Sequence, residues 1–441
     1  MINLGRDSFR PHLPATALVV GAAALLGASI ALLLQPTVLT QYVASPRMLA
    51  LTHAFTLLFV TLVYAGTLQQ LPAVMFVTKL MWPRLGYASL STLAIGALVL
   101  VIGFGTGMRP VLLVLGGTMV CLALGAVLLQ LLLTARTRPP KDPASRALIT
   151  AVCYLVVTVV LGLVLAAVRA RPGLAAALGY RPELHQMTGL LGAFLLGIGG
   201  SGQKLLSMFA LSKGGPSWRL KAMAYLVHVC VAALVVGVVA GAGASGAAGV
   251  LAWVSLGALV AASTLQVWEV LALLRRRLRK RLEDSVMRYV IGHAFLPVAG
   301  VLLLVGQREA AATAFLLGFV GLAVSGMLIK ILSFLTWTAA YAAPRSVQPR
   351  PAAPQGGATG ASPGPSSPPL LRQLLRPELE PLTTWTLGGG AGLATLTMAL
   401  SSDLTAVASV SAVAAAIALT IGAASQLAQT LHIVYRVSTA K

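Results

Sequence analysis

The residues best suited to chemistry in this chain are four histidines that lie within long apolar stretches: His53, His185, His228 and His293. Neutral imidazole is a common metal ligand and the usual axial ligand of haem iron. An ionisable side chain inside a membrane is costly to bury and is therefore a candidate for function. We predict that His53, His185 and His293 bind a cofactor and that His228 binds a metal.

Each histidine taken alone also has a structural alternative, either as a hydrogen-bonding group between helices or as a side chain at the membrane surface. No carboxylate lies at comparable depth, so the set favours metal or haem binding over a proton relay or a cation transporter. Glu269 lies near the end of an apolar stretch and is expected to pair with the basic run Arg275–Arg281. Lys204 and Lys330 are expected to extend to the lipid headgroups.

The composition places these histidines in a membrane. Of the 441 residues, 58% are hydrophobic and only 10% are charged, and the mean hydropathy is +0.89. Globular domains carry roughly 25% charged residues, so an ordinary soluble protein is excluded. The three cysteines, Cys121, Cys153 and Cys230, have unrelated spacing and suggest neither a disulfide framework nor a zinc site.

Runs of about 20 apolar residues are long enough to cross a bilayer, and their recurrence predicts twelve transmembrane helices. The predicted fold class is therefore an all-α, polytopic membrane protein. The helices are placed at residues 13–34, 48–76, 85–105, 109–134, 146–169, 184–212, 218–242, 246–274, 286–306, 310–341, 383–402 and 405–435.

The distribution of positive charge predicts the orientation. The chain has 32 Lys and Arg against 10 Asp and Glu, for a net charge of +22. With the N-terminus in the cytoplasm, the cytoplasmic loops and tails hold 24 basic residues and the opposite loops hold six. This asymmetry predicts that both termini are cytoplasmic, in a bacterial inner membrane. The basic run lies between two apolar spans, so the expected partner is the lipid bilayer and not nucleic acid.

The composition changes after the tenth predicted helix. The stretch from Ala343 to Pro369 consists mostly of Pro, Gly, Ser and Ala and cannot bury apolar surface. We therefore divide the chain into a ten-helix membrane body at 1–342, a disordered cytoplasmic linker at 343–382 and a two-helix membrane segment at 383–441.

A short pattern recurs near the inner ends of three predicted helices, where a glycine is followed four residues later by Gln or Lys. The pairs are Gly66 with Gln70, Gly200 with Lys204, and Gly326 with Lys330. The glycines lie 134 and 126 residues apart, which corresponds to four helices. This predicts three pseudo-repeated four-helix arcs in which equivalent glycines let a neighbouring helix approach. The alternative is that glycine plus an inner-end lysine is simply common in membrane helices.

The segment Leu51–Leu57, continuing to Gly66 and Pro72, resembles the second helix of the large subunit of the haem–copper oxidase superfamily. It is most similar to uncharacterised oxidase-like and NnrS-type haem proteins. Weaker likeness is found at His185–Phe209, Tyr289–Gly306 and Gly326–Trp337. The resemblance covers roughly residues 13–341, and the fold it implies has twelve helices in three four-helix arcs.

The resemblance also implies roles for single residues. His53 matches the histidine that binds the low-spin haem, and His185 begins the helix that supplies a ligand to the copper beside the high-spin haem. The family's histidine pair near the outer end of helix 10 has no counterpart in Glu309–Phe315, and the helix of His228 lacks the adjacent histidines that bind copper. Reduction of oxygen or nitric oxide is therefore not expected, because it needs haem and copper held together.

The leading hypothesis is an oxidase-like protein that binds a His-ligated haem b or metal and acts in electron transfer, nitric oxide response or haem and copper handling. Copper is a second cofactor candidate, and membrane or c-type cytochrome subunits are candidate partners. Two alternatives remain: a polytopic transporter, and a structural subunit without a cofactor.

Overall fold

The structure is a computed structural model that describes residues 12–175, 181–213, 218–239, 245–341, 369–400 and 404–438. Those residues form helices joined by short loops, and they contain no β-strand beyond one isolated bridge between Ser212 and Arg277. The predicted all-α class is therefore confirmed. Most of the predicted linker lies outside the described residues. The end of the predicted linker is described. It contains the 3-10 helix η6 (Leu371–Leu374), and the long helix that follows begins at Leu379 rather than at 383.

Within the described residues, ten helices are long and apolar enough to cross a membrane. They are α1 (His12–Leu34), α2 with η3 and α3 (Pro46–His53, Ala54–Thr61, Leu62–Leu68), α5 (Pro83–Gly105), α6 (Pro110–Thr137), α7 (Pro143–Ala170), α11 (Trp218–Val239), α12 (Ser245–Arg275), α13 (Asp284–Leu304), α14 with η5 and α15 (Arg308–Thr313, Ala314–Gly321, Leu322–Tyr341) and α17 (Thr405–Ser438). Two further helical segments overlap the predicted spans 184–212 and 383–402 but are not among these ten: α9 with η4 and α10 (Pro182–Met187, Thr188–Leu195, Leu196–Phe209), and α16 (Leu379–Leu400).

Several of these helices begin at a proline, which has the backbone angle of a first helical residue and no amide hydrogen to leave unpaired. The prolines are Pro46, Pro83, Pro110, Pro143 and Pro182. Ser45 and Asp142 also cap their helices, because their side chains accept hydrogen bonds from the amides of Met48 (3.3 Å) and Ser145 (3.0 Å). The starts of the helices that carry His53 and His185 are thus fixed locally.

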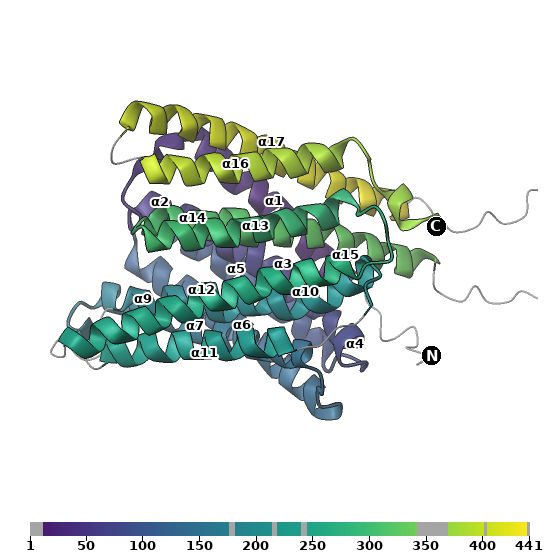
Figure 1. Ribbon diagram of the computed structural model, residues 1–441, viewed down its shortest axis with the longest axis horizontal. Helices are drawn as coiled ribbons and strands as arrows, with labels where there is room; N and C mark the ends of the chain where they lie inside the picture. Colours follow the sequence, from purple (N-terminus) through teal and green to yellow (C-terminus); the bar gives the residue numbers. More distant parts are fainter. Residues whose placement is uncertain are drawn as a thin grey trace, which may run out of the picture.

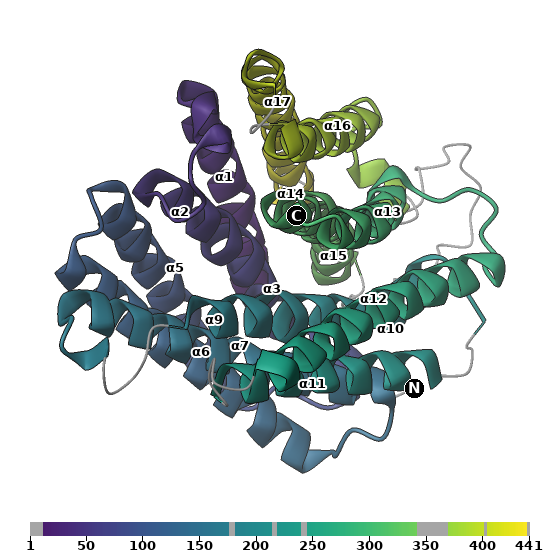
Figure 2. The same ribbon diagram turned by 60° about the vertical axis from the view of Figure 1, so that its left-hand side comes forward.

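The long helices run roughly side by side, and α16 and α17 (yellow-green) lie together along one side of the bundle (Figure 1). Seen from a second direction, this pair lies beside α1, α13 and α14 (Figure 2). The contact is specific, since the Thr420 hydroxyl of α17 donates a 3.0 Å hydrogen bond to the carbonyl oxygen of Ser29 in α1. The helices after the linker therefore belong to the same packed body as the first helix.

Three segments depart from α-helical geometry in the same way. The π-helices η3, η4 and η5 are each eight residues long and begin at Ala54, Thr188 and Ala314. These starts lie 134 and 126 residues apart, the same offsets that separate Gly66, Gly200 and Gly326. Single π turns in otherwise α-helical segments occur frequently at functional sites.

Each of the three glycines lies against the long helix that precedes it. A Cβ atom at Gly66 would come within 2.5 Å of Ala17 in α1, and one at Gly200 would come within 3.0 Å of Ala147 in α7. At Gly326 it would come within 2.3 Å of the carbonyl oxygen of Ser285, at the start of α13. In all three places the glycine permits close approach of two helices, as expected from the sequence.

We expect Gly326→Ala to destabilise the protein by about 1–3 kcal/mol, because its methyl group would displace the backbone of α13. Thermal unfolding in detergent measures the effect. Gly27→Ala is the matched control, since a Cβ there has no atom within 4 Å. Equal unfolding midpoints for the two variants would contradict the role given to Gly326.

Two ion pairs differ from expectation. Glu269 does not pair with the basic run: it accepts from Nε of Arg219 at 2.5 Å and from Gln203 at 2.7 Å, because α11 lies beside α12 and the run turns outward. Lys330 does not extend to the headgroups. Its side chain is buried and bonded to Glu283, which lies in the loop before α13.

Glu283 also receives a 2.5 Å ion pair from Arg279. Burial raises the pKa of Glu283, but the charges and hydrogen bonds of Lys330 and Arg279 together outweigh burial and hold the pKa below its ordinary value. The stabilisation by this carboxylate is therefore present above its unfolded-state pKa and is lost as the pH falls through its folded-state pKa.

A buried arginine connects four helices. Arg288 of α13 is 0% exposed, and its guanidinium donates to Ser325 of α15 (3.0 Å), Thr384 of α16 (3.1 Å) and the amide oxygen of Gln426 in α17 (2.7 Å). It also contacts a carboxylate oxygen of Glu380 in α16 at 3.4 Å. These bonds attach α16 and α17 to the helices before the linker.

Candidate functional site

Two of the four predicted histidines come together. His53 is the last residue of α2 and His185 lies in α9, so each stands just before a π-helical segment. Their ring centroids are 6.2 Å apart and their planes differ by 18°. Both side chains are partly buried. Residues 132 positions apart in the chain thus form one two-histidine site.

The hydrogen bonds of the pair define which ring nitrogens are free. Nδ1 of His53 donates to the carbonyl oxygen of Leu49 at 2.8 Å, and Nδ1 of His185 donates to that of Thr158 at 2.8 Å. A carbonyl oxygen can only accept, so in each neutral ring the proton is on Nδ1 and the lone pair on Nε2. Neither Nε2 has a hydrogen-bond partner among the described residues. This arrangement is typical of metal-binding histidines, whose second nitrogen is held by a backbone carbonyl.

Two residues that the sequence did not single out hold the rings in place. The ring of Phe104 in α5 stacks on that of His53 with centroids 4.6 Å apart. His185 lies against Gly162 of α7, where a Cβ would come within 2.9 Å of its ring carbon Cε1. A side chain at Gly162 would therefore move the imidazole.

The distance between the two ring centroids, taken alone, is close to that of two imidazoles bound to one metal, and the rings are nearly parallel. A metal bound at about 2.0–2.1 Å by one nitrogen of each imidazole holds the centroids roughly 6.4 Å apart, since a ring nitrogen lies about 1.2 Å from its centroid. The observed 6.2 Å agrees within a few tenths of an ångström. The described residues contain no group of three or more His, Cys, Asp or Glu that could hold a metal ion. A zinc site needs three or four protein ligands, so the pair by itself does not make one.

His293 of α13 lies elsewhere and is buried against α12 and η5. Its Nδ1 donates to the carbonyl oxygen of Tyr289 at 2.8 Å, and its Nε2 accepts from the side-chain amide of Gln266 at 3.0 Å. Its ring packs edge-on against Phe319 with centroids 5.0 Å apart. Both nitrogens are in use, so His293 would have to give up one of these bonds to bind a cofactor.

His228 of α11 is bonded to a tyrosine of α7. Its Nδ1 lies 2.8 Å from the hydroxyl of Tyr154, and the two rings stack with centroids 5.6 Å apart. Metal binding by His228 stays a prediction, and this tyrosine connects it to the helix that also contacts His185.

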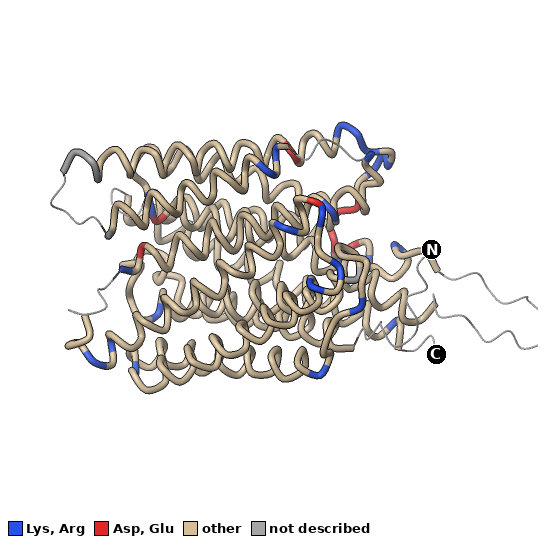
Figure 3. The backbone as a smooth tube through the Cα atoms, turned by 90° about the horizontal axis from the view of Figure 1, so that it is seen from below, with Lys and Arg blue, Asp and Glu red and all other residues tan. Residues whose placement is uncertain are grey.

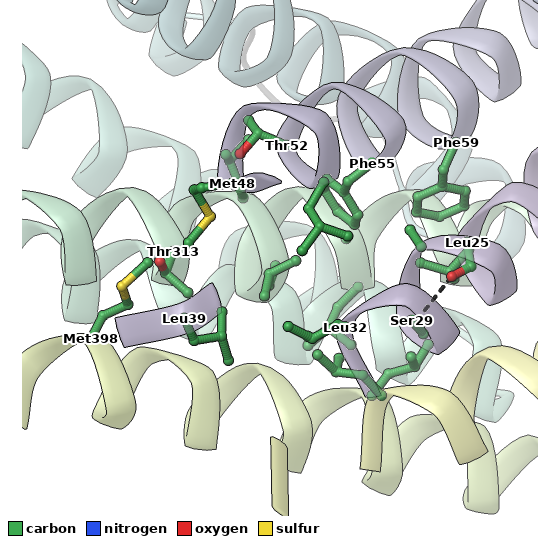
Figure 4. Close-up of a pocket in the computed structure, with 18 residues that line it drawn as sticks. Leu25, Ser29, Leu32, Leu39, Met48, Thr52, Phe55, Phe59, Thr313 and Met398 are labelled. Carbon is green, nitrogen blue, oxygen red and sulfur yellow. Dashed lines mark hydrogen bonds between the residues drawn. The ribbon is translucent and has the colours of Figure 1, made fainter. Parts of the chain in front are cut away.

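An apolar cavity of about 120 Å³ lies between α1, α2, η5, α16 and α17. Figure 4 shows Met48, Thr52, Thr313 and Met398 toward one end of it and Phe59 and Leu25 toward the other. No histidine lines this cavity. His53 follows Thr52 in the chain, but its ring stacks on Phe104 of α5 instead. The cavity and the histidine pair are therefore separate features.

A second, smaller cavity of about 50 Å³ lies between α3, α10 and α15. It is lined by residues at matching offsets: Tyr64, Ile198 and Val324; Thr67, Ser201 and Met327; Leu71, Leu205 and Ile331. Tyr289 of α13 also lines it, and the buried hydroxyls of Tyr64 and Tyr289 have no hydrogen-bond partner among the residues that the structure describes.

No protein-family model matches the chain, and no curated protein matches its sequence.

Proposed function

We propose that this chain is an oxidase-like membrane protein that holds the iron of one b-type haem between His53 and His185 and acts in electron transfer. The observation that supports this most directly is the pair itself: two neutral imidazoles with free Nε2 atoms, with ring centroids 6.2 Å apart. The resemblance of the helix around His53 to a haem-binding helix favours haem over a bare metal ion.

The described residues suit electron transfer better than oxygen reduction. If both His53 and His185 held the iron of a haem, no position on the iron would be left for oxygen. When bound, such a haem supplies reversible one-electron oxidation and reduction. The carbonyl oxygens of Leu49 and Thr158 orient the two imidazoles, and Phe104 covers one face of His53. By the resemblance, Thr313 lies in the stretch where the haem–copper oxidases carry the second ligand of the low-spin haem. In this chain the proposed second ligand is His185 instead.

The proposal includes twelve membrane spans in three four-helix units. It is supported by the common offsets of the π-helices and the three glycines, and by the matching positions around the smaller cavity. Lys and Arg lie mainly at the two ends of the bundle, and more of them lie at one end (Figure 3). We take that end as cytoplasmic in a bacterial inner membrane. A membrane-bound or c-type cytochrome subunit is the proposed electron partner.

An absorption spectrum and metal analysis of the purified full chain test the proposal. We expect the reduced-minus-oxidised spectrum of a low-spin b-type haem and about one iron per chain. A protein with copper but no haem would keep the two-histidine centre and overturn the haem. A colourless protein without metal, even after incubation with haem, would overturn the function.

A further inference from the structure

The basic segment Arg275–Arg281 follows α12 and has six positive side chains among seven residues. Arg279 pairs with Glu283. The side chains of four others make no hydrogen bond or ion pair with any described residue: Arg275, Arg276, Lys280 and Arg281. These four residues are exposed, and Figure 3 shows the segment as its longest stretch of blue. The segment therefore presents a concentrated positive charge that the described residues do not neutralise.

The backbone of the basic segment is held in place. The amide of Leu278 donates to the carbonyl oxygen of Leu211 at 3.2 Å, and the hydroxyl of Ser212 donates to that of Leu273 at 2.8 Å. These bonds connect the segment to the loop after α10. The unpaired cations are consequently presented from a fixed backbone, which lowers the entropy lost when they bind a partner.

Two tryptophans place the basic segment close to the membrane surface. Trp218 and Trp268 form an edge-to-face pair with centroids 5.4 Å apart, are 46% and 47% exposed, and both lie near the guanidinium of Arg219. Exposed tryptophans in membrane proteins gather at the headgroup level. Trp268 precedes Arg275 by seven residues of α12, or about 10 Å along the helix axis. Leu278 is apolar and 64% exposed, as suits a segment lying on a lipid surface.

We propose that the basic segment Arg275–Arg281 binds the headgroups of anionic phospholipids in the adjoining leaflet. Charge complementarity supports this partner, because several phosphates can lie at once against four unpaired cations at the membrane surface. The position near the tryptophan pair favours lipid over a soluble polyanion such as RNA. Since the cations are exposed, the interaction is screened by salt.

Binding of fluorescent phosphatidylglycerol to the full chain in detergent tests the proposal. The variant carries Arg275→Gln, Arg276→Gln, Lys280→Gln and Arg281→Gln together. We expect its apparent Kd to rise by about tenfold or more relative to the native chain, because each cation near an anionic surface contributes to the attraction. High salt should weaken binding to the native chain, and phosphatidylcholine should not compete.

The control variant removes the same charge from the opposite end of the bundle, with Arg47→Gln, Arg109→Gln, Arg169→Gln and Arg171→Gln. All four residues are exposed. We expect this variant to bind like the native chain. An equal loss in both variants would overturn the proposal in favour of attraction by net charge. Displacement of the lipid by inorganic phosphate or an RNA oligonucleotide at the same phosphate concentration would assign the segment to a soluble anion instead.

Discussion

His53→Ala and His185→Ala are each expected to remove the haem or to convert it from low-spin to high-spin. Each substitution takes away one of the two Nε2 atoms that have no hydrogen-bond partner among the described residues. The reduced-minus-oxidised spectrum and the iron content per chain are the measurements. His432→Ala is the control, since His432 is only partly buried, accepts a 3.3 Å hydrogen bond from Nε of Arg376 and lies outside the histidine pair. It should leave both readouts unchanged.

Gly162→Ala makes this test sharper because it leaves both histidines present. The added methyl group would come within 2.9 Å of the His185 ring and would shift it. We expect a changed spin state or weaker haem retention, with the helical content unchanged. A spectrum that survives all three substitutions would assign the iron to other ligands and remove the functional argument from the pair.

Arg288→Ala is expected to destabilise the protein by about 3–5 kcal/mol, the usual effect of removing one partner from a buried ion pair. The substitution leaves Glu380 and Gln426 without their main hydrogen-bond donor at the junction of α13, α16 and α17. Denaturant-induced or thermal unfolding in detergent measures the loss. Arg276→Ala is the control, since its exposed side chain has no partner in the described part of the chain, and its effect should be within about 0.5 kcal/mol.

A double variant distinguishes two causes of the destabilisation: the lost attraction between Arg288 and Glu380, and the burial of an unpaired charge. Arg288→Met removes the cation with a side chain of similar length, and Glu380→Gln removes the opposing charge. If the cost arises from an uncompensated carboxylate, the double variant should be more stable than Arg288→Met alone. An Arg288→Ala protein that unfolds like the Arg276→Ala control would show that the junction is held by apolar packing.

The helices could be predicted well because a run of about 20 apolar residues is a strong and local signal. The first predicted helix, 13–34, differs from α1 by one residue, and close helix contact at Gly326 was foreseen from its spacing. The proximity of His53 and His185 could also be predicted, because the sequence places both toward the outer ends of their helices. Their function as ligands remains a proposal.

Side-chain partners could not be predicted from the sequence, since they depend on which helices become neighbours. Arg219 pairs with Glu269 because α11 lies beside α12, although Arg275 is much nearer in the chain. Gly162 supports His185, yet it is one of 44 glycines and has no distinguishing pattern. In the sequence, Arg288 resembles the other cations near the loop before α13. Its burial depends on the packing of α16 and α17 against it.

The extra residue in each π-turn changes the direction in which side chains before the turn point relative to side chains after it. In η3 and η4, the amides of Leu62 and Leu196 bond to carbonyl oxygens five residues back, at Leu57 and Leu191, so each turn holds one residue more than an α-turn. Deleting one residue there would rotate the preceding half of the helix by about 100° relative to the following half. Gly66 could keep its contact with α1 while His53 turned away from His185. An extra residue in the middle of a helix thus sets which side chains face one another at its far end, independently of how its near end packs.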